Sequence, residues 1–296
     1  MSRRFYTGGV SSGATNVASH GGFGFHASNV SGTRPAAAWG TAITPGNNTF
    51  PAYAQILAGA SVTSAVYGIQ ITLYGTNVAA NSKNCLVNIG VDTAGGTSWT
   101  TLIPALFASN LVGATTGGGM VYYFPVYAPA GSSFAAQASV NNATVGTVRV
   151  VIDVFGLPLS GAARAGTVVT AVGATLGTSS GTAVTPGGVS EGAWTSLGSI
   201  GADSWYFQLG VGCNNAVQNF ATYAWDVSPD NGSTILIRDA LFSTNSSEQL
   251  LPYNNAVQHI NQRTIASGAT LYARAQCSGT PDTGWSAIVY AVSGAV

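Results

Sequence analysis

The chain has 296 residues, of which nine are basic and nine acidic, so that 6% of its positions are charged, against about 25% in an ordinary soluble domain. With 46% apolar residues and zero net charge, it lacks the low hydrophobicity and high net charge of a disordered chain. Nine scattered cations are too few to neutralise a nucleic-acid backbone. No apolar run of about 18 residues is present to span a membrane, and the first nine residues lack the apolar stretch of a signal peptide.

The composition favours short strands joined by turns. There are 39 glycines and 11 prolines, whereas Lys83 is the single lysine and Glu191 and Glu248 are the two glutamates, so good formers of surface helices are scarce. A chain of this length is expected to hold two domains of sandwich size. Hydroxyls, amides and glycines must then cover most of the surface.

The first elements in chain order are an arm and a first set of strands. Residues 1–39 are rich in Gly, Ser and Ala, and we expect this arm to be held by a partner subunit or by the second domain. Residues 40–156 form a first β-sandwich. Its predicted strands centre on 52–58, 65–75, 84–92, 98–103, 119–127, 133–140 and 146–155. In the last of these, apolar and mixed positions alternate from Val148 to Phe155, the period-2 pattern of a half-buried strand.

A linker and a second set of strands follow. We predict a linker over residues 157–180 and a second β-sandwich over residues 181–296. Its strands are expected at 193–200, 204–213, 220–228, 233–238, 256–265, 269–277 and 285–292. Turn residues occur at matching places in the two halves, in Asp92–Gly96 and in Ser228–Gly232.

Four blocks of sequence recur in the same order. The segment 40–46 returns as 181–187 with six matches in seven, and Tyr53 then falls on Trp194. Residues 105–110 return at 240–245, residues 131–138 at 268–275, and residues 148–156 at 287–294. The first three offsets are 141, 135 and 137 residues. The fold class predicted is therefore all-β, with two tandem antiparallel β-sandwich domains, jelly-roll-like, related by internal duplication.

Two stretches of the first copy resemble known proteins. Asn88–Trp99 followed by Leu102–Pro104, and then Tyr122–Gly131, resemble an uncharacterised group of tailed-bacteriophage virion structural proteins with a tandem β-sandwich repeat. The resemblance covers roughly residues 40–294, although the second copy lacks the Ala-Gly-Gly turn and the Phe-Pro step. It implies a place on the virion surface, as a fibre, decoration or tail component. It carries no catalytic residues that could be transferred.

Candidate catalytic and metal-binding patterns are weak. Gly9–Gly13 and Gly177–Gly181 match G-x-S-x-G, but neither has the strand before the serine and the helix after it that a nucleophile elbow needs. Asp226–Gly232 offers oxygen ligands, yet a turn with Asn231 and Gly232 at positive φ explains the same residues without calcium. Paired carboxylates for glycoside hydrolysis are scarce among nine acids. We therefore expect no enzyme, no catalytic residue, no cofactor and no metal.

Cysteines and tryptophans complete the set of candidate residues. Cys85, Cys213 and Cys277 are far apart and lie at no zinc-binding spacing, so three buried thiols are expected. Aromatic rings can stack on sugars or fill sandwich cores. Three tryptophans lack an aromatic at the matching position of the other copy, which makes them the candidates for glycan contact: Trp99, Trp225 and Trp285.

Three functions remain open. The first is a non-enzymatic bacteriophage virion structural protein that acts through self-assembly and protein–protein contacts. The alternative is a tandem carbohydrate-binding module for attachment to a host surface glycan, which exposed aromatics on one face would indicate. The third is a double jelly-roll capsid subunit. The expected partners are copies of the chain itself, in a symmetric homo-oligomer such as a trimer, and other virion proteins, because uncharged sheet edges lack the lysines that keep monomers apart.

Overall fold

Strands account for almost every regular element of the computed structural model. It describes residues 25–27, 40–74, 84–108, 120–141, 146–156, 165–213, 221–244, 250–252, 259–260, 264–281 and 283–295. The two short helices in this part of the chain are 3-10 turns, η2 (Gly59–Ser61) and η3 (Leu176–Thr178). Neither has the length or the apolar run that crossing a bilayer would need.

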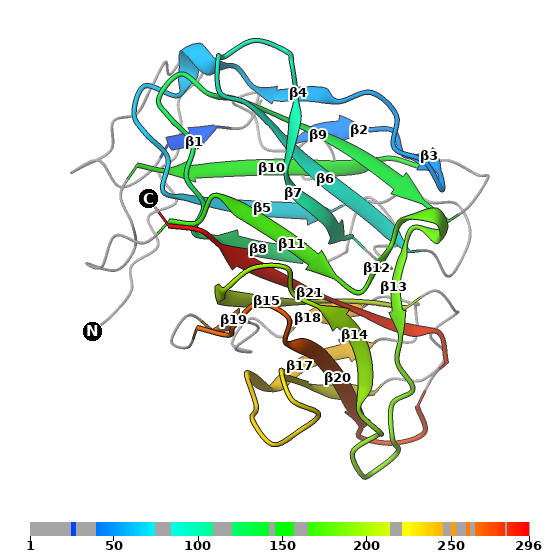
Figure 1. Ribbon diagram of the computed structural model, residues 1–296. Helices are drawn as coiled ribbons and strands as arrows, with labels where there is room; N and C mark the ends of the chain where they lie inside the picture. Colours follow the sequence, from blue (N-terminus) through cyan, green and yellow to red (C-terminus); the bar gives the residue numbers. More distant parts are fainter. Residues whose placement is uncertain are drawn as a thin grey trace, which may run out of the picture.

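The first sandwich is built from two five-stranded sheets (Figure 1). One holds β1 (Phe25–Ala27), β2 (Thr41–Ile43), β5 (Gly68–Tyr74), β8 (Met120–Phe124) and β10 (Val148–Phe155), with β10 and β5 at its centre. The other holds β3 (Gly46–Asn47), β4 (Ala54–Leu57), β6 (Cys85–Asp92), β7 (Thr100–Phe107) and β9 (Ser133–Val140). Apolar side chains such as Ile71, Ile89 and Ile152 fill the space between the sheets and are fully buried.

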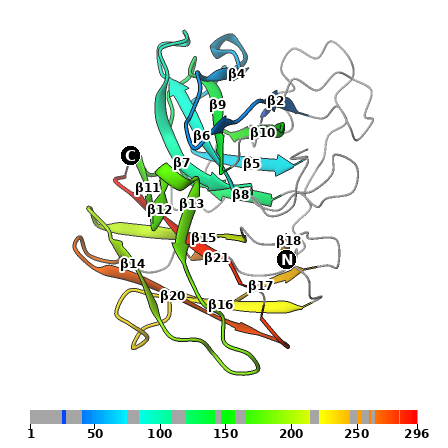
Figure 2. The same ribbon diagram turned by 90° about the vertical axis from the view of Figure 1, so that its right-hand side faces the viewer.

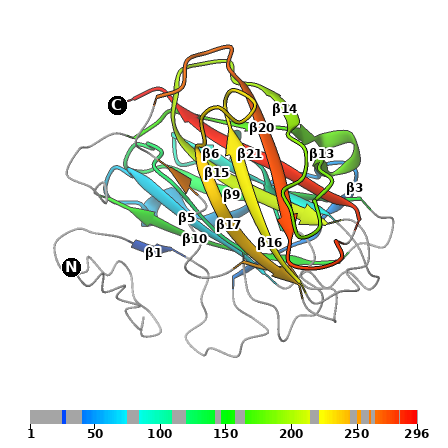
Figure 3. The same ribbon diagram turned by 90° about the horizontal axis from the view of Figure 1, so that it is seen from below.

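The second sandwich also has two sheets. One contains β11 (Val168–Val172), β12 (Ala174–Thr175), β13 (Ser180–Ala183), β15 (Ser204–Cys213), β19 (His259–Ile260) and β21 (Trp285–Ser293). The other runs in the order β14 (Thr195–Ser199), β20 (Thr270–Cys277), β16 (Thr222–Ser228), β17 (Ile237–Thr244) and β18 (Leu250–Pro252). In Figure 3 the sheet that contains β20, β16 and β17 crosses in front of the sheet that contains β15 and β21.

The two sandwiches share one strand order. In the first, β10 lies between β1 and β5, with β2 also paired to β10, and β5 pairs with β8. In the second, β21 pairs with β11, β13 and β15 in the same relation, and β15 pairs with β19. The other sheets run β4-β9-β6-β7 and β14-β20-β16-β17. This agreement supports the predicted duplication, whereas the common origin of the halves stays a prediction.

Strand register corrects two of the four repeated blocks. Thr41 pairs with Val150 and the matching Thr182 pairs with Ala287, so the last block, which placed Val148 on Ala287, is displaced by two residues. Val87 pairs with Leu106 in the first sandwich, and Trp225 pairs with Ala240 in the second. Leu106 therefore corresponds to Ala240, so the block offset of 135 at Ala105 is one residue too large. A shift of one residue turns every side chain of a strand to the opposite face, and the matching Ala-Leu-Phe letters therefore lie on opposite faces of the two sheets.

Three strands lie outside the predicted sandwiches, namely β1 in the arm and β11 and β12 in the linker. Val168–Val172, within the predicted linker, is β11 and pairs with β21. In the arm, Phe25–Ala27 is β1 and pairs with residues 152–154 of β10. The described part of the arm thus pairs with the first sandwich of its own chain, whereas we expected a partner subunit or the second domain to hold the arm.

The second sandwich packs one face of the sheet that contains β15 and β21 against the side of the first sandwich where β7 and β8 lie. Figure 2 shows β15 and β21 lying below β7 and β8. Every residue of β15 and β21 is buried, because one face lines the second core and the other meets the first sandwich. We call this contact the seam.

Candidate functional site

Tyr290 occupies the centre of the seam. Its hydroxyl donates to the carbonyl oxygen of Ala105 at 2.8 Å and accepts the amide hydrogen of Phe107, with an N···O distance of 3.0 Å. Both groups belong to β7, the last strand of its sheet. One hydroxyl thus satisfies two backbone groups at a sheet edge, which would otherwise need water or another strand.

Aromatic rings surround Tyr290. The ring of Tyr122 lies edge-on to it at 5.6 Å, and the ring of Phe124 lies at 5.7 Å. The Tyr122 hydroxyl donates to the carbonyl oxygen of Phe107 at 2.8 Å, and the Tyr206 hydroxyl donates to that of Tyr123 at 2.5 Å. Burial raises the pKa of the Tyr122, Tyr206 and Tyr290 hydroxyls well above the ordinary value of 10. These three tyrosines are therefore neutral donors at physiological pH.

Small polar side chains continue the seam toward β13. The Asn84 amide donates to the Ser180 hydroxyl at 2.7 Å, and the hydroxyls of Ser139 and Ser179 lie 2.6 Å apart. The amide of Tyr123 donates to the side-chain oxygen of Gln208 at 3.2 Å. The side-chain contacts described across the seam come from hydroxyls, amides and aromatic rings, without an ion pair among them.

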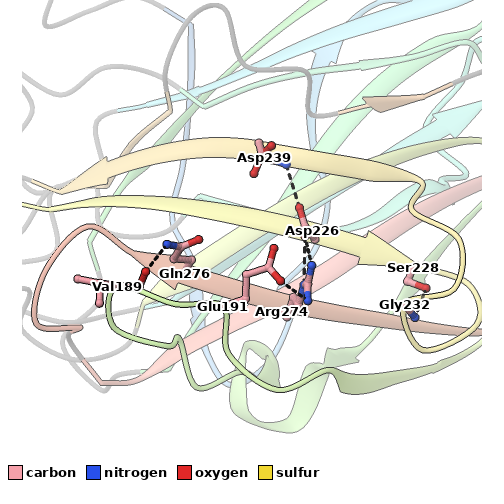
Figure 4. A network of polar contacts seen from close by, with 8 residues as sticks. All are labelled: Val189, Glu191, Asp226, Ser228, Gly232, Asp239, Arg274 and Gln276. Carbon is pink, nitrogen blue, oxygen red and sulfur yellow. Dashed lines mark hydrogen bonds and ion pairs between the residues drawn. The ribbon is translucent and has the colours of Figure 1, made fainter.

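A second cluster, on the outer face of the β14-β20-β16-β17 sheet, contains most of the charge contacts that the structure describes (Figure 4). Arg274 on β20 donates to one carboxylate oxygen of Asp226 from Nε at 3.1 Å and from a terminal nitrogen at 2.8 Å. Its other terminal nitrogen forms an ion pair with Glu191. The guanidinium carbon lies 4.4 Å from the ring centre of Trp194, a cation–π contact. We call these four residues the arginine cluster.

The arginine cluster supports an unusual piece of backbone. Asp239 on β17 has a φ of 52°, in the left-handed region that side-chain-bearing residues seldom adopt. Its amide donates to the second carboxylate oxygen of Asp226 at 2.9 Å. Figure 4 shows Asp226 between Asp239 and Arg274, with its carboxylate serving both. The aspartate therefore fixes the bulge in β17 at the same time as it binds the arginine.

The loop between β13 and β14 crosses the sheet that contains β20, beside the arginine cluster. The amides of Gly187 and Gly192 both donate to the carbonyl oxygen of Ala275, at 3.0 Å and 2.9 Å. The Gln276 amide donates to the carbonyl oxygen of Val189 at 2.7 Å, and Val189 itself is 82% exposed. The loop between β13 and β14 is thereby held against β20 and carries an apolar side chain outward.

The structure separates the three candidate tryptophans. Trp225 and Trp285 are 0% and 1% exposed, and their rings pack 6.0 Å apart inside the second core. A ring with no exposed face cannot stack on a sugar, so the expectation of glycan contact is wrong for both. Trp99 is partly exposed, with its ring 6.4 Å from that of Tyr53. The first copy lacks a matching aromatic because its core is filled by other side chains. Val87 stands at the position of the first sandwich that corresponds to Trp225.

Other predicted residues lie where their local chemistry places them. Cys85, Cys213 and Cys277 are buried thiols, as predicted. Ser179, the serine of the second G-x-S-x-G match, follows η3 and precedes β13, the reverse of a nucleophile elbow. The first match, Gly9–Gly13, lies outside the described residues. Asn231 and Gly232 have φ of 58° and 103°, which confirms the predicted turn.

The arginine cluster was not predicted from the sequence. Arg274 lies 48 residues after Asp226 and 83 residues after Glu191, and no local motif connects them. The repeat contained the signal: aligned by strand register, Asp226 corresponds to Asn88 and Arg274 to Gln137. A change from neutral to charged residues at two facing positions would have indicated the pair.

Comparisons with known proteins find distant structural likeness only. No family model and no protein of curated function matches this sequence. PNGF-II, a solved structure, matches with 8% identity and a TM-score of 0.35 over 85% of this chain, which spans 64% of the PNGF-II chain. PNGase F of Flavobacterium meningosepticum, a glycosylasparaginase, matches with 10% identity and a TM-score of 0.27 over 86% of this chain and 92% of its own.

A third match is the tandem CBM22 domain of Xyn10C from Paenibacillus barcinonensis, with 12% identity and a TM-score of 0.24 over 79% of this chain and 81% of its own. At these identities and TM-scores the likeness concerns the coarse arrangement of strands alone. The matches nevertheless correct our expectation that the chain is not an enzyme, because an enzyme, PNGase F, is among the structures similar to it.

Proposed function

We propose that this protein is a structural subunit of a tailed-bacteriophage virion, located at the particle surface as a fibre, decoration or tail component. It assembles with copies of itself and with other virion proteins. The proposal is supported by the resemblance of Asn88–Trp99 and Tyr122–Gly131 to such proteins, and by the way this chain makes contacts between domains.

The seam is the observation that carries the proposal. It joins two sandwiches through tyrosine hydroxyls, serines and amides, with the β7 edge closed by Tyr290. The edge strands β4 and β14 carry no charged residue either. Proteins that remain monomeric commonly protect such edges with lysines or other charges. Uncharged edges of this kind fit a subunit whose remaining edges are closed by neighbours.

The carbohydrate-binding alternative predicts an exposed aromatic platform. Wherever the structure describes the exposure of an aromatic side chain, that side chain is buried or only partly exposed. Trp99 and Trp194 sit on different sandwiches, and each is already engaged, with Tyr53 and with Arg274 respectively. The aromatic residues thus serve the cores and the seam, which favours the structural role. A double jelly-roll capsid subunit is a form of the same role.

Light scattering of the purified chain at micromolar concentration in 1 M salt tests the assembly. Uncharged contacts are little screened by salt, so we expect a symmetric oligomer such as a trimer to persist. A single species of monomer mass would contradict the proposal. Antibodies against the chain, imaged on purified phage particles, test its location, and absence of label from the particle surface would contradict the virion role.

A further inference from the structure

The turn that follows β16 carries a chemically labile pair of residues. Asn231–Gly232 is the single Asn-Gly step in the 296 residues, and Asn231 is exposed to water. Because glycine has no Cβ to crowd its amide nitrogen, this nitrogen can approach the side-chain carbonyl carbon of the asparagine before it. The matching turn of the first sandwich, Asp92–Gly96, contains no asparagine. The second sandwich therefore has a reactive step that the first lacks at this place.

Ser228 binds the nitrogen that would react. Ser228 is fully buried, and its hydroxyl accepts the amide hydrogens of Gly232 and Asp230, with N···O distances of 2.7 Å and 3.2 Å. The same hydroxyl donates to a carboxylate oxygen of Asp230 at 3.0 Å, and that oxygen also accepts the amide of Thr234 at 2.7 Å. An amide hydrogen that is bound in this way must leave its acceptor before the nitrogen can react. The folded turn therefore slows the reaction.

The turn also packs against the arginine cluster. A Cβ added at Gly232 would overlap the indole nitrogen of Trp194, so the backbone of Gly232 lies directly against this ring. The ring of Trp194 in turn contacts the guanidinium of Arg274. A change in the backbone path at Gly232 would therefore alter the support of the ring that covers Arg274.

We propose that Asn231 is a site of spontaneous covalent modification, and that the hydrogen bond from Gly232 to Ser228 sets the rate. The amide nitrogen of Gly232 bonds to Cγ of Asn231, the bond from Cγ to the side-chain nitrogen breaks, and ammonia leaves with the proton that the Gly232 nitrogen released. Water then opens the five-membered imide at either carbonyl carbon, which gives aspartate or isoaspartate. In isoaspartate the main chain runs through the side chain and is longer by a methylene group, so Gly232 is displaced from Trp194. This modification does not depend on the assembly proposed above.

Peptide mass spectrometry tests the role of Ser228. The folded chain is incubated at mildly alkaline pH, and conversion of the amide at position 231 to an acid is followed with time. We expect Ser228→Ala to raise the rate by about fivefold to tenfold, because the amide hydrogen of Gly232 loses its acceptor. The matched control is Asn88→Ala, which removes the acceptor of another backbone amide, that of Ala105 in the first sandwich. It should leave the rate at position 231 unchanged.

Two outcomes of this experiment would overturn the proposal. Equal rates in the wild type and in Ser228→Ala would show that the hydrogen bond does not control the reaction. An equal increase in Ser228→Ala and Asn88→Ala would show that general loss of stability controls it. Circular dichroism checks that each variant folds. The wild type unfolded in urea provides a second measurement, since it has no turn and should react faster than the folded chain, and equal rates there would also contradict the proposal.

Thermal unfolding tests the effect on Trp194. After partial reaction, the isoaspartate fraction should melt at a lower temperature than the unmodified fraction, because Gly232 no longer lies against the ring. Asn231→Asp introduces the same charge without lengthening the backbone and should melt like the wild type. Asn231→Gly keeps a residue that adopts positive φ and has no side-chain amide, so it should show no modification at this turn. If Asn231→Asp melts as low as the isoaspartate fraction, charge is responsible and the proposed displacement from Trp194 is wrong.

Discussion

In both sandwiches a side-chain oxygen accepts the amide hydrogen of a left-handed residue in a β-bulge, but the residues around that oxygen differ. In the second, Asp226 accepts the amide of the left-handed Asp239 and binds Arg274. In the first, the side-chain oxygen of Asn88 accepts the amide of the left-handed Ala105 at 2.8 Å, and the facing position is Gln137.

The aromatic beside each pair differs as well. It is Trp194 in the second sandwich and Tyr53 in the first, and Tyr53 hydrogen-bonds Gln137 and Thr101. The bulge therefore needs an acceptor oxygen at this position and does not need a charge. The charged version gains two ion pairs and takes on the cost of partly burying them.

The largest loss of stability is expected when Tyr290 in the seam is replaced by the residue that the first sandwich has at the corresponding position. By strand register, Asp153 is the first-sandwich residue that corresponds to Tyr290. Tyr290→Asp places this carboxylate at a fully buried position, beside which the described part of the chain offers no cation. A carboxylate there must be desolvated without a partner, which costs several kcal/mol, about 4 or more. Urea unfolding measures the loss. Tyr290→Phe, which removes only the hydroxyl and leaves two backbone groups unpaired, should cost about 1 to 3 kcal/mol. Equal losses in the two variants would contradict the argument.

Substitutions of Asp226 should separate the contribution of its charge to stability from the contribution of its hydrogen bond to Asp239. Asp226→Ala leaves the amide of Asp239 without its acceptor and Arg274 with Glu191 alone, and we expect a loss of about 3 kcal/mol in the free energy of unfolding. Asp226→Asn copies Asn88 and keeps the acceptor, so it should cost less than half as much. Asn88→Ala in the first sandwich is the matched control for the bulge. A larger loss for Asp226→Asn than for Asp226→Ala would refute the comparison.

Alkaline pH should weaken the seam. The pKa values of the Tyr122, Tyr206 and Tyr290 hydroxyls are raised by burial above the unfolded value of 10. Below pH 10 both states are protonated and the stability is complete. Above pH 10 only the unfolded state releases these protons, so stability falls by about 1.4 kcal/mol per pH unit for each tyrosine.

Urea midpoints between pH 9 and pH 11.5 measure this slope. The variant Tyr290→Phe should be shallower than the wild type by the contribution of one tyrosine. An identical slope in the two proteins would show that Tyr290 ionises as freely in the folded chain as in the unfolded one.

The smallest effect is expected at the aromatic of the arginine cluster. Trp194→Tyr copies Tyr53 of the first sandwich and retains a ring over Arg274, so the cation–π contact weakens without disappearing, and the loss should be about 0.5 kcal/mol. Trp194→Ala removes the ring and should cost clearly more. Thermal unfolding resolves the two, and equal melting temperatures for them would show that the ring does not support Arg274.

The sequence could predict the strands because their patterns are local. The predicted strand at 133–140 coincides with β9, and that at 204–213 coincides with β15. The strand predicted at 233–238 lies at 237–244 instead. The residues before it belong to a turn in which Asp230 accepts the amide of Thr234 at 2.7 Å, and an apolar pattern does not show where such a turn ends.

What the sequence could not predict depends on contacts between distant strands. The repeated Ala-Leu-Phe letters are displaced by one residue relative to the equivalent bulges at Ala105 and Asp239, and the pairings of Val87 with Leu106 and of Trp225 with Ala240 show it. The burial of Trp225 follows from its partner Trp285, 60 residues later. The seam depends on Tyr290 reaching Ala105, 185 residues away. No pattern within one strand carries that information.

The complete burial of β15 and β21 has a consequence for how the chain melts. These strands belong to the second core and to the seam at once, so opening the seam exposes one of their faces to water while the other still lines a core. The first sandwich in turn loses the cover of its β7 edge. Neither half therefore has a stable state of its own to pass through, and the molecule should behave as a single cooperative unit, with the calorimetric and van't Hoff enthalpies of its thermal transition equal.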